Sequence, residues 1–387
     1  MRLPRRLTAS VTASALLLTA VAACDSGSAT PSEKTDVIIG ADLASGSAID
    51  AAYARALQLR VEQVNASGVL DKHNLVLRVQ DNKSDPTAAL RNISMLADDP
   101  AVAAIITGGC NECVVGAAKT INDKRVPTIA LAAADEVSTP VEERRHLFKL
   151  GPNANDSAAT LVAELSRTGT KRVALLYSDD LYGKGGHVRM AAQLDRAGIK
   201  VVNQLPVKPT ATDVTQTVGT LTDTEPEALV VWTGPDQATL AAVSAKAAGF
   251  QGRLYFDAAA AGDLFVPQEA AAATSDATMV FTQILAIDDV IATTPAKAAR
   301  KQWFRDYTSR YGSYSGVASF GADAVTLIAD AVAKAGGDRK RIRDILETTQ
   351  TDGLSGPIRL TPDNHSGLMP QALTLLVARA GRWRLLS

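Results

Sequence analysis

Short apolar runs alternate with longer amphipathic stretches along most of the chain. Val37–Gly40 has the pattern of a buried strand, and Ala48–Asn65 places Leu57, Val61 and Val64 on one helical face. Similar runs predict strands at 75–80, 103–107, 128–131, 172–177, 201–205, 228–232, 253–256 and 279–283. Helical patterns lie between them, at 86–97, 114–123, 155–167, 183–197, 214–221, 237–248, 295–311 and 317–335. Alternation without tight hairpins predicts an α/β fold with parallel sheets covered on both faces.

The strand–helix rhythm starts again after Lys149–Pro152, which divides the pattern into two units of similar size. A length of 387 residues also favours two domains. Two α/β units joined near residue 150, and again near 282, predict a bilobed molecule with a cleft. Small ligands bind at domain interfaces and at the carboxyl ends of parallel strands, so we expect a ligand site in that cleft.

The first residues form an export signal. Arg2, Arg5 and Arg6 precede the uncharged apolar stretch 7–22, which is too short to span a membrane comfortably. The end of this stretch, Val21–Cys24, resembles the lipobox of bacterial lipoproteins, which implies cleavage before a lipidated Cys24. We expect a signal peptide at 1–23 and a flexible tether at 24–35, rich in Gly, Ser, Thr and Pro. The alternative, a plain secretory signal with an accidental Cys, is disfavoured.

The amino-acid composition and net charge indicate which kinds of binding partner are less expected. Hydrophobic residues make up 46% and charged residues 21% of the chain, as in ordinary globular proteins. Removing 1–23 leaves 37 basic and 41 acidic residues, a net charge of −4. A mildly acidic chain without a Lys/Arg cluster argues against nucleic acid as a partner.

Four segments together resemble one family. Gly40–Gly46, Asp81–Pro86, Ser178–Gly183 and Gly353–Ile358 are similar, in order and spacing, to motifs of the substrate-binding proteins of branched-chain amino acid ABC transporters. The resemblance extends from about Asp36 to Leu386. It implies the type I periplasmic binding protein fold, two Rossmann-like lobes with parallel sheets joined by a three-crossover hinge. It also implies discontinuous lobes, 36–150 with 282–357 and 151–281 with 358–387.

The resemblance also implies positions for ligand anchors. Asn111 falls where the family has a carboxylate-binding Ser, and Asn keeps a hydrogen-bond donor there. Ala132, Ala133 and Ala134 fall on a family loop whose backbone amides face the ligand. Asp257 lies one position from the family's acidic partner for an ammonium group, which aligns with Ala258. These departures favour a small apolar or aromatic carboxylate, with leucine-like amino acids as the alternative.

Further candidate ligand residues lie at strand ends and helix starts. Tyr182 is expected in a loop before a helix that begins at Gly183, where its ring closes over the ligand; the alternative is a surface Tyr packed on its own helix. Trp232 ends a strand and is equally consistent with a ligand contact or a core position. Ser47 and Ser315 are candidate ligand contacts or helix caps, and Asp50 is expected to cap the helix 51–65.

Cys110 and Cys113 flank two residues at the predicted start of a helix. In an oxidising compartment this spacing favours a local disulfide. A redox role is an alternative, because a helix N-terminus lowers a thiol pKa. A metal site is a less favoured alternative, because it would need further ligands. By the resemblance, many relatives have a disulfide from this position to the loop that contains Ser84 here, so the usual partner is absent.

No catalytic constellation is present in the sequence. It has no G-x-S-x-G, H-E-x-x-H or P-loop pattern, and its four His residues are scattered. We therefore expect neither catalysis nor a metal or cofactor. The leading hypothesis is a solute-binding protein, lipid-anchored on the extracytoplasmic face of the cell membrane, that delivers a small molecule to ABC permease subunits. A ligand-sensing lipoprotein that acts in signalling is the alternative, and an envelope enzyme is disfavoured.

Overall fold

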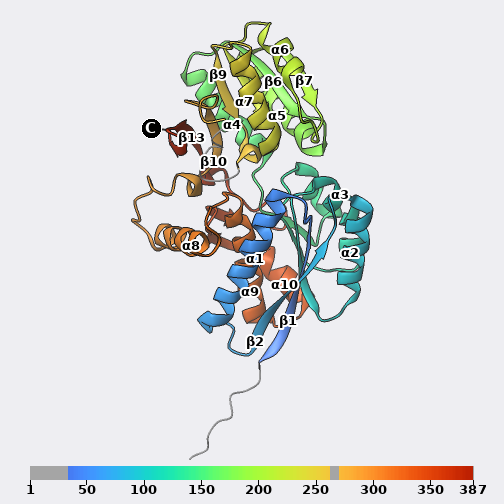
Figure 1. The fold of residues 1–387 in the computed structure, drawn as a ribbon. Helices are drawn as coiled ribbons and strands as arrows, with labels where there is room; N and C mark the ends of the chain where they lie inside the picture. Colours follow the sequence, from blue (N-terminus) through green and yellow to red (C-terminus); the bar gives the residue numbers. More distant parts are fainter. Residues whose placement is uncertain (1–33, 262–269, 387) are drawn as a thin grey trace, which may run out of the picture. The chain divides into compact units, whose positions relative to one another are not determined.

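The computed structural model describes residues 34–261 and 270–386. The predicted signal peptide, the lipidated Cys24 and nearly all of the tether lie outside the described residues. Two main sheets are built from parallel strands joined by helices, which confirms the predicted α/β fold with two lobes (Figure 1).

The first sheet contains five parallel strands and determines where the first half of the cleft lies. In spatial order they are β2 (His73–Asp81), β1 (Thr35–Leu43), β3 (Val102–Thr107), β4 (Thr128–Ala130) and β5 (Leu147–Lys149). The helices α1 (Ala48–Ser67), α2 (Pro86–Asp98) and α3 (Asn111–Asp123) connect them. The chain winds toward opposite edges on either side of β1, so the strand order reverses between β1 and β3. Ligands bind beside such a reversal, at the carboxyl ends of the strands.

The second sheet repeats this arrangement with more strands. Its spatial order is β14 (Arg382–Leu385), β13 (Leu373–Arg379), β10 (Thr278–Thr282), β9 (Arg253–Phe256), β8 (Ala228–Trp232), β6 (Arg172–Ser178) and β7 (Lys200–Val207). Its helices are α4 (Ala154–Arg167), α5 (Leu181–Arg196), α6 (Thr215–Thr222) and α7 (Pro235–Ala247). The order reverses between β6 and β8, which makes the loops after these strands the second half of the expected cleft.

The last two strands of this sheet differ from the sequence prediction. The pattern predicted no tight hairpin, but β13 and β14 are antiparallel and are joined by Ala380 and Gly381. Both turn residues have positive φ, 51° and 71°, the conformation of a two-residue turn that matches strand twist. A turn with Ala at its first position lacks the Asn-Gly or Asp-Gly signal by which such turns are recognised.

Three late helices return to the first sheet's side of the molecule. They are α8 (Pro295–Tyr311), α9 (Ala318–Ala335) and α10 (Arg339–Leu346), and α9 packs along α1 although about 270 residues of sequence separate them (Figure 1). Gly321 of α9 approaches Tyr53 and Ala56 of α1 closely, so small residues allow the two helices to pack tightly. Helix α9 therefore packs against α1 and supports it.

The chain's last crossing between the sheets comes later than the sequence suggested. Residues 358–387 were assigned to the second lobe, but His365 and Gly367 are hydrogen-bonded to the backbone of Lys149 in β5. The His365 ring also lies 4.4 Å from that of Phe148. A short hairpin, β11 (Gln350–Asp352) with β12 (Pro357–Arg359), precedes this segment, and the chain joins the second sheet only at β13. The other lobe boundaries stay predictions.

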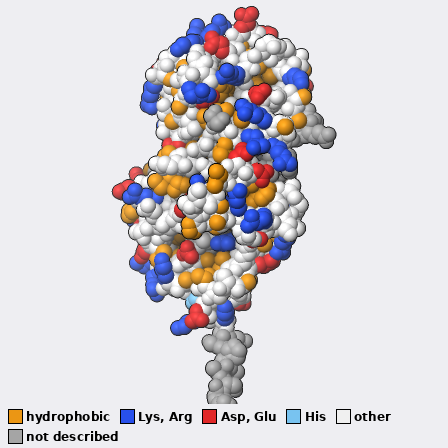
Figure 2. All heavy atoms as spheres, turned by 90° about the vertical axis from the view of Figure 1, so that its left-hand side faces the viewer, with side chains coloured by type: hydrophobic (Ala, Val, Ile, Leu, Met, Phe, Trp, Pro, Cys, Tyr) orange, Lys and Arg blue, Asp and Glu red, His pale blue; other side chains and the backbone are white. Residues whose placement is uncertain are grey.

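The described surface carries mixed charge. Figure 2 shows basic and acidic side chains interspersed over the face it displays. Within 34–261 and 270–386, no helix combines the length and apolar character needed to cross a membrane.

Candidate functional site

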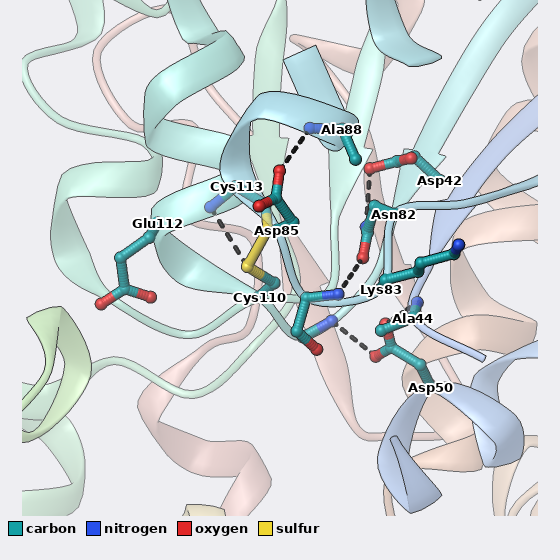
Figure 3. The surroundings of a disulfide bond; sticks show 12 residues. Asp42, Ala44, Asp50, Asn82, Lys83, Asp85, Ala88, Cys110, Glu112 and Cys113 are labelled. Atoms are coloured by element: carbon teal, nitrogen blue, oxygen red, sulfur yellow. Dashed lines mark hydrogen bonds between the residues drawn. A yellow bond between two sulfur atoms is a disulfide. The ribbon is translucent and has the colours of Figure 1, made fainter. Parts of the chain in front are cut away.

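The two cysteines form a disulfide at the start of α3, as predicted. Cys110 and Cys113 are bonded, with their Cα atoms 5.2 Å apart. The backbone N–H of Cys113 also donates to Cys110 Sγ at 3.2 Å, so the bridge closes the first turn of the helix. Figure 3 shows the Glu112 side chain pointing away from the sulfur atoms. The bridge therefore holds Asn111 and Glu112 in the first turn of α3, at the carboxyl edge of the first sheet.

Asn111 uses its side chain to hold the neighbouring loop. Its Oδ1 accepts hydrogen bonds from the backbone N–H groups of Ala133, at 3.0 Å, and Ala134, at 2.8 Å. Two of the three amides predicted to face a ligand are thus already bonded within the protein, and Ala132 is buried. Asn111 Oδ1 acts here as an acceptor within the protein, whereas its sequence position predicts a donor to the ligand.

Asp50 does not cap a helix. Helix α1 begins at Ala48, and Ser47 is its cap, since the Ser47 hydroxyl accepts from the backbone N–H of Asp50. The buried Asp50 carboxylate accepts instead from the N–H groups of Ala44, at 2.7 Å, and Gly109, at 2.8 Å. Burial raises its pKa. Asp50 therefore ties together the loops after β1 and β3, which flank the reversal of strand order.

Tyr182 lies inside the second lobe and not in an open loop. Helix α5 begins at Leu181, two residues earlier than the expected start at Gly183, so Tyr182 lies within its first turn, and Asp180 caps the helix. The buried Tyr182 hydroxyl donates to the Asp257 carboxylate, and its ring centre lies 6.2 Å from that of Trp232. Apolar packing of the ring explains why the helix carries it inward.

Asp257 and Trp232 complete this buried cluster. Both residues are almost fully buried, and burial raises the pKa of Asp257 to about 7 against the opposing hydrogen bond from Tyr182. Asp257 Oδ1 and Trp232 Nε1 have no hydrogen-bond partner among the described residues. The three predicted residues do lie together, but they pack against each other beneath the second lobe's edge.

A cavity of about 520 Å³ lies beside these loops. Its walls are α1, the first turn of α7, the end of α8 and the C-terminal hairpin, so it is lined from both sheets' units. Its lining residues are Gly46, Ser47, Ala48, Ile49, Ala51, Ala52, Arg55, Pro235, Asp236, Ala238, Thr239, Phe256, Ala260, Thr274, Tyr307, Ser313, Ser315 and Trp383. This volume is within the range of about 300–1,000 Å³ that is typical of small-molecule sites.

The cavity contains only part of the predicted site. Ser47 and Ser315 line it, whereas the other predicted ligand residues do not. Those others are Asn111, Ala132, Ala133, Ala134, Tyr182, Trp232 and Asp257. The predicted set therefore divides into three groups: two serines at the cavity, the Asn111 loop, and the cluster around Asp257. Their contact with a ligand stays a prediction.

Sequence reasoning missed the charged residues of the cavity. Arg55 is on the third turn of α1, and its guanidinium carbon lies 5.8 Å from the centre of the Tyr311 ring. Asp236 is in the first turn of α7, directly after the carboxyl end of β8. Asp236 follows a predicted strand and comes directly after Gly234 and Pro235, and this position could have indicated a ligand site. Arg55 lies on a helix face, and its sequence position gave no such indication.

Two acidic side chains of the first lobe, Glu112 and Asp135, face helix α5 of the second. Glu112 Oε1 accepts from the backbone N–H of Leu181 at 2.9 Å, and Asp135 lies 3.4 Å from Arg189 Nε. Asp135 also lies 3.6 Å from the buried ammonium group of Lys149 in β5. Because Leu181 and Arg189 are eight residues apart, they lie on one side of α5, and that side contacts the first lobe.

Comparison with known proteins agrees with this geometry. The family model described as "Periplasmic binding protein" matches residues 39–381. No curated protein matches the chain closely enough to count as a relative. Among solved structures, an extracellular ligand-binding receptor from Rhodopseudomonas palustris is similar, with 20% identity over 92% of this chain and 100% of that one, and a TM-score of 0.81.

Two further similar structures are of proteins whose descriptions name leucine. An ABC transporter substrate-binding protein from Desulfitobacterium hafniense, in complex with Leu, shares 18% identity over 91% of this chain and 100% of that one, with a TM-score of 0.74. A leucine binding protein from Thermotoga maritima shares 18% identity over 91% of this chain and 98% of that one, with a TM-score of 0.77. Likeness at this identity establishes the fold and not the ligand. On the match to residues 39–381, the chain belongs to the periplasmic binding protein family.

Proposed function

We propose that this protein is the solute-binding component of an ABC importer, which captures a small molecule between its lobes and delivers it to a permease. The observation that carries the proposal is the cavity of about 520 Å³ whose walls come from both lobes. A ligand that touches both walls favours the arrangement in which they lie close together, by its differential affinity for that arrangement. Closure then reports occupancy to the permease.

The N-terminal segment determines the proposed cellular location of the protein. The lipobox-like Val21–Cys24 implies a diacylglyceryl group on Cys24, and two acyl chains anchor a protein stably where one does not. Residues 24–35 then act as the tether that links the folded body to the extracytoplasmic face of the membrane. In phase partitioning, the Cys24→Ala protein should leave the detergent phase while its folded body keeps its unfolding temperature. Retention in the detergent phase would refute the anchor.

The proposal includes no chemical step. The polar groups at the cavity comprise one guanidinium, one carboxylate and several hydroxyls, and no His or Cys is among its lining residues. Such groups bind and orient a solute, and they do not form a nucleophile–base pair. Mixed surface charge on the displayed face (Figure 2) supports a small molecule in preference to nucleic acid as the ligand.

A thermal-shift screen tests the proposed function. The detergent-solubilised full chain is heated with each member of a library of amino acids, amines, carboxylates and sugars. A true ligand raises the unfolding temperature by mass action. Ala51→Trp places a ring in the cavity and should abolish the shift, whereas Gln58→Trp places the same ring on the exposed face of α1 and should preserve it. Shifts that survive Ala51→Trp would contradict binding in this cavity.

A further inference from the structure

The polar side chains around the cavity differ in one respect from the residues predicted to bind the ligand. Asn111 and Tyr182 are bonded within the protein, to backbone amides and to Asp257. By contrast, the side chains of Arg55 and Asp236 form no hydrogen bond or ion pair with any other described residue. The cavity therefore brings together a cation and an anion that have no hydrogen bond or ion pair among the residues that the structure describes.

The two charged side chains belong to opposite walls of the cavity. Arg55 lies on α1 of the first lobe and Asp236 on the first turn of α7 in the second. They form no ion pair with each other, so their charged atoms are more than 4.0 Å apart. Arg55 is exposed, and its guanidinium lies over the Tyr311 ring, 5.8 Å from the ring centre. A planar guanidinium suits a carboxylate, which it binds through two parallel hydrogen bonds.

The wall between the polar groups is apolar. Ala48, Ala51 and Ala52 form a stripe of small side chains on α1 that ends at Arg55. From Ser47 to Arg55 the helix rises about 12 Å, at roughly 1.5 Å per residue. Phe256 and Trp383 of the second lobe also line the cavity. The space beside Arg55 therefore fits an extended aliphatic or flat body better than a second charged group.

Hydroxyl groups add weaker contacts. Thr239, Ser313 and Ser315 line the cavity, and their side chains make no hydrogen bond to another described residue. A hydroxyl both donates and accepts, so these groups complement either end of a polar ligand.

Resting on the proposed function, we infer that the ligand is an extended dipolar solute, such as an ω-amino acid, whose carboxylate binds Arg55 and whose ammonium group binds Asp236. In an α-amino acid both charged groups are attached to one carbon, so they span a shorter gap between two protein charges than the charged groups of an ω-amino acid do. An ω-amino acid separates its charges by a methylene chain, which lies along the alanine stripe. Binding both ends also draws the two lobes together.

Calorimetry with a matched set of probes tests this inference on the detergent-solubilised full chain. The dipolar probes are 4-aminobutanoate, 5-aminopentanoate and 6-aminohexanoate, and the controls are pentanoate, pentylamine and leucine. At least one dipolar probe should bind at least about tenfold more tightly than every control. If no dipolar probe exceeds the controls, the inference is wrong.

Two variants that each remove one charge test which end of the dipolar probe binds Arg55 and which binds Asp236. Arg55→Gln should weaken the best dipolar probe at least about tenfold and leave pentylamine unchanged, and Asp236→Asn should weaken the probe while leaving pentanoate unchanged. Equal weakening of all probes by either variant would show that Arg55 and Asp236 act only in lobe closure, which overturns the inference. A ligand whose binding is blocked by Ala51→Trp but is unaffected by Arg55→Gln and Asp236→Asn would also overturn the inference. The proposed function would then remain intact. The absence of any ligand blocked by Ala51→Trp would count against the proposed function itself.

Discussion

The side-chain oxygen of Asn111 accepts a hydrogen bond from the backbone N–H of Ala134 at 2.8 Å. It accepts a second from Ala133, so one carboxamide satisfies two amides at the carboxyl edge of the first sheet. These amides point where the sequence predicted a ligand carboxylate. The protein's own acceptor therefore fills a role that the ligand was expected to fill.

This relationship predicts the effect of shortening Asn111. Asn111→Ala leaves the two amides without their acceptor, and Ala134 is buried, so the free energy of unfolding should fall by about 1–3 kcal/mol. Asn111→Asp retains an acceptor oxygen and should lose less. Urea denaturation of both variants measures the difference; equal losses would show that the hydrogen bonds contribute little.

Gly186 of α5 packs against the indole of Trp232. A Cβ at this position would lie 2.0 Å from Trp232 Nε1, which is buried and cannot move freely. Gly186→Ala should therefore destabilise the protein by at least about 1–3 kcal/mol through overpacking. Gly116 of α3 has open space around its Cβ position, so Gly116→Ala should instead raise stability by about 0.5–1 kcal/mol. Differential scanning calorimetry should show opposite shifts in unfolding temperature, and shifts of the same sign would contradict this packing.

Asp257 makes stability depend on pH. Its pKa is raised by burial from 3.8 to about 7, so the folded state holds a proton that the unfolded state has released between these values. The contribution of this group is full below the lower pKa, and the free energy of unfolding falls as pH rises toward about 7. Asp257→Asn should reduce this decrease in the free energy of unfolding. The control Asp195→Asn, at an exposed position, should preserve the decrease. Denaturation curves across this range measure the slope, and an unchanged slope in Asp257→Asn would contradict the protonated state.

Contacts between α5 and the first lobe hold the lobes near each other. Glu112 bonds the Leu181 amide and Asp135 pairs with Arg189. The double variant Glu112→Ala/Arg189→Ala should increase the radius of gyration in small-angle scattering, because both contacts across the lobes are lost. Lys184→Ala removes an ion pair to Asp179 within the second lobe and serves as the control. No difference between the double variant and the control would show that these contacts do not hold the lobes together.

Much of the fold was predictable because its elements are long and periodic. The apolar run at Val37–Gly40 lies within β1, and the helix predicted at 86–97 lies within α2 (Pro86–Asp98), with Pro86 in its first turn. The local disulfide was also predictable, since three-residue spacing and an export signal are visible in the sequence. In these cases the determining interactions are local.

The cavity was less predictable because its residues are determined by packing between distant segments. Asn111 was assigned a ligand role from its position, but its partners lie 22 and 23 residues away and compete for the same oxygen. Arg55 lies on a helix where an exposed Arg is unremarkable, and only the closeness of α7 makes it part of a cavity. The segment around His365 was misplaced for the same reason, since its pairing with Lys149 spans more than 200 residues.

Native mass spectrometry tests the central claim, that one small molecule is captured in the cavity between the lobes. The full chain is incubated with a small-molecule extract of the growth medium, released from detergent and weighed intact. We expect a single adduct of small mass at one copy per chain, lost in Ala51→Trp and retained in Gln58→Trp, with both variants folded by circular dichroism. No adduct from any extract, or the same adduct in Ala51→Trp, would contradict it.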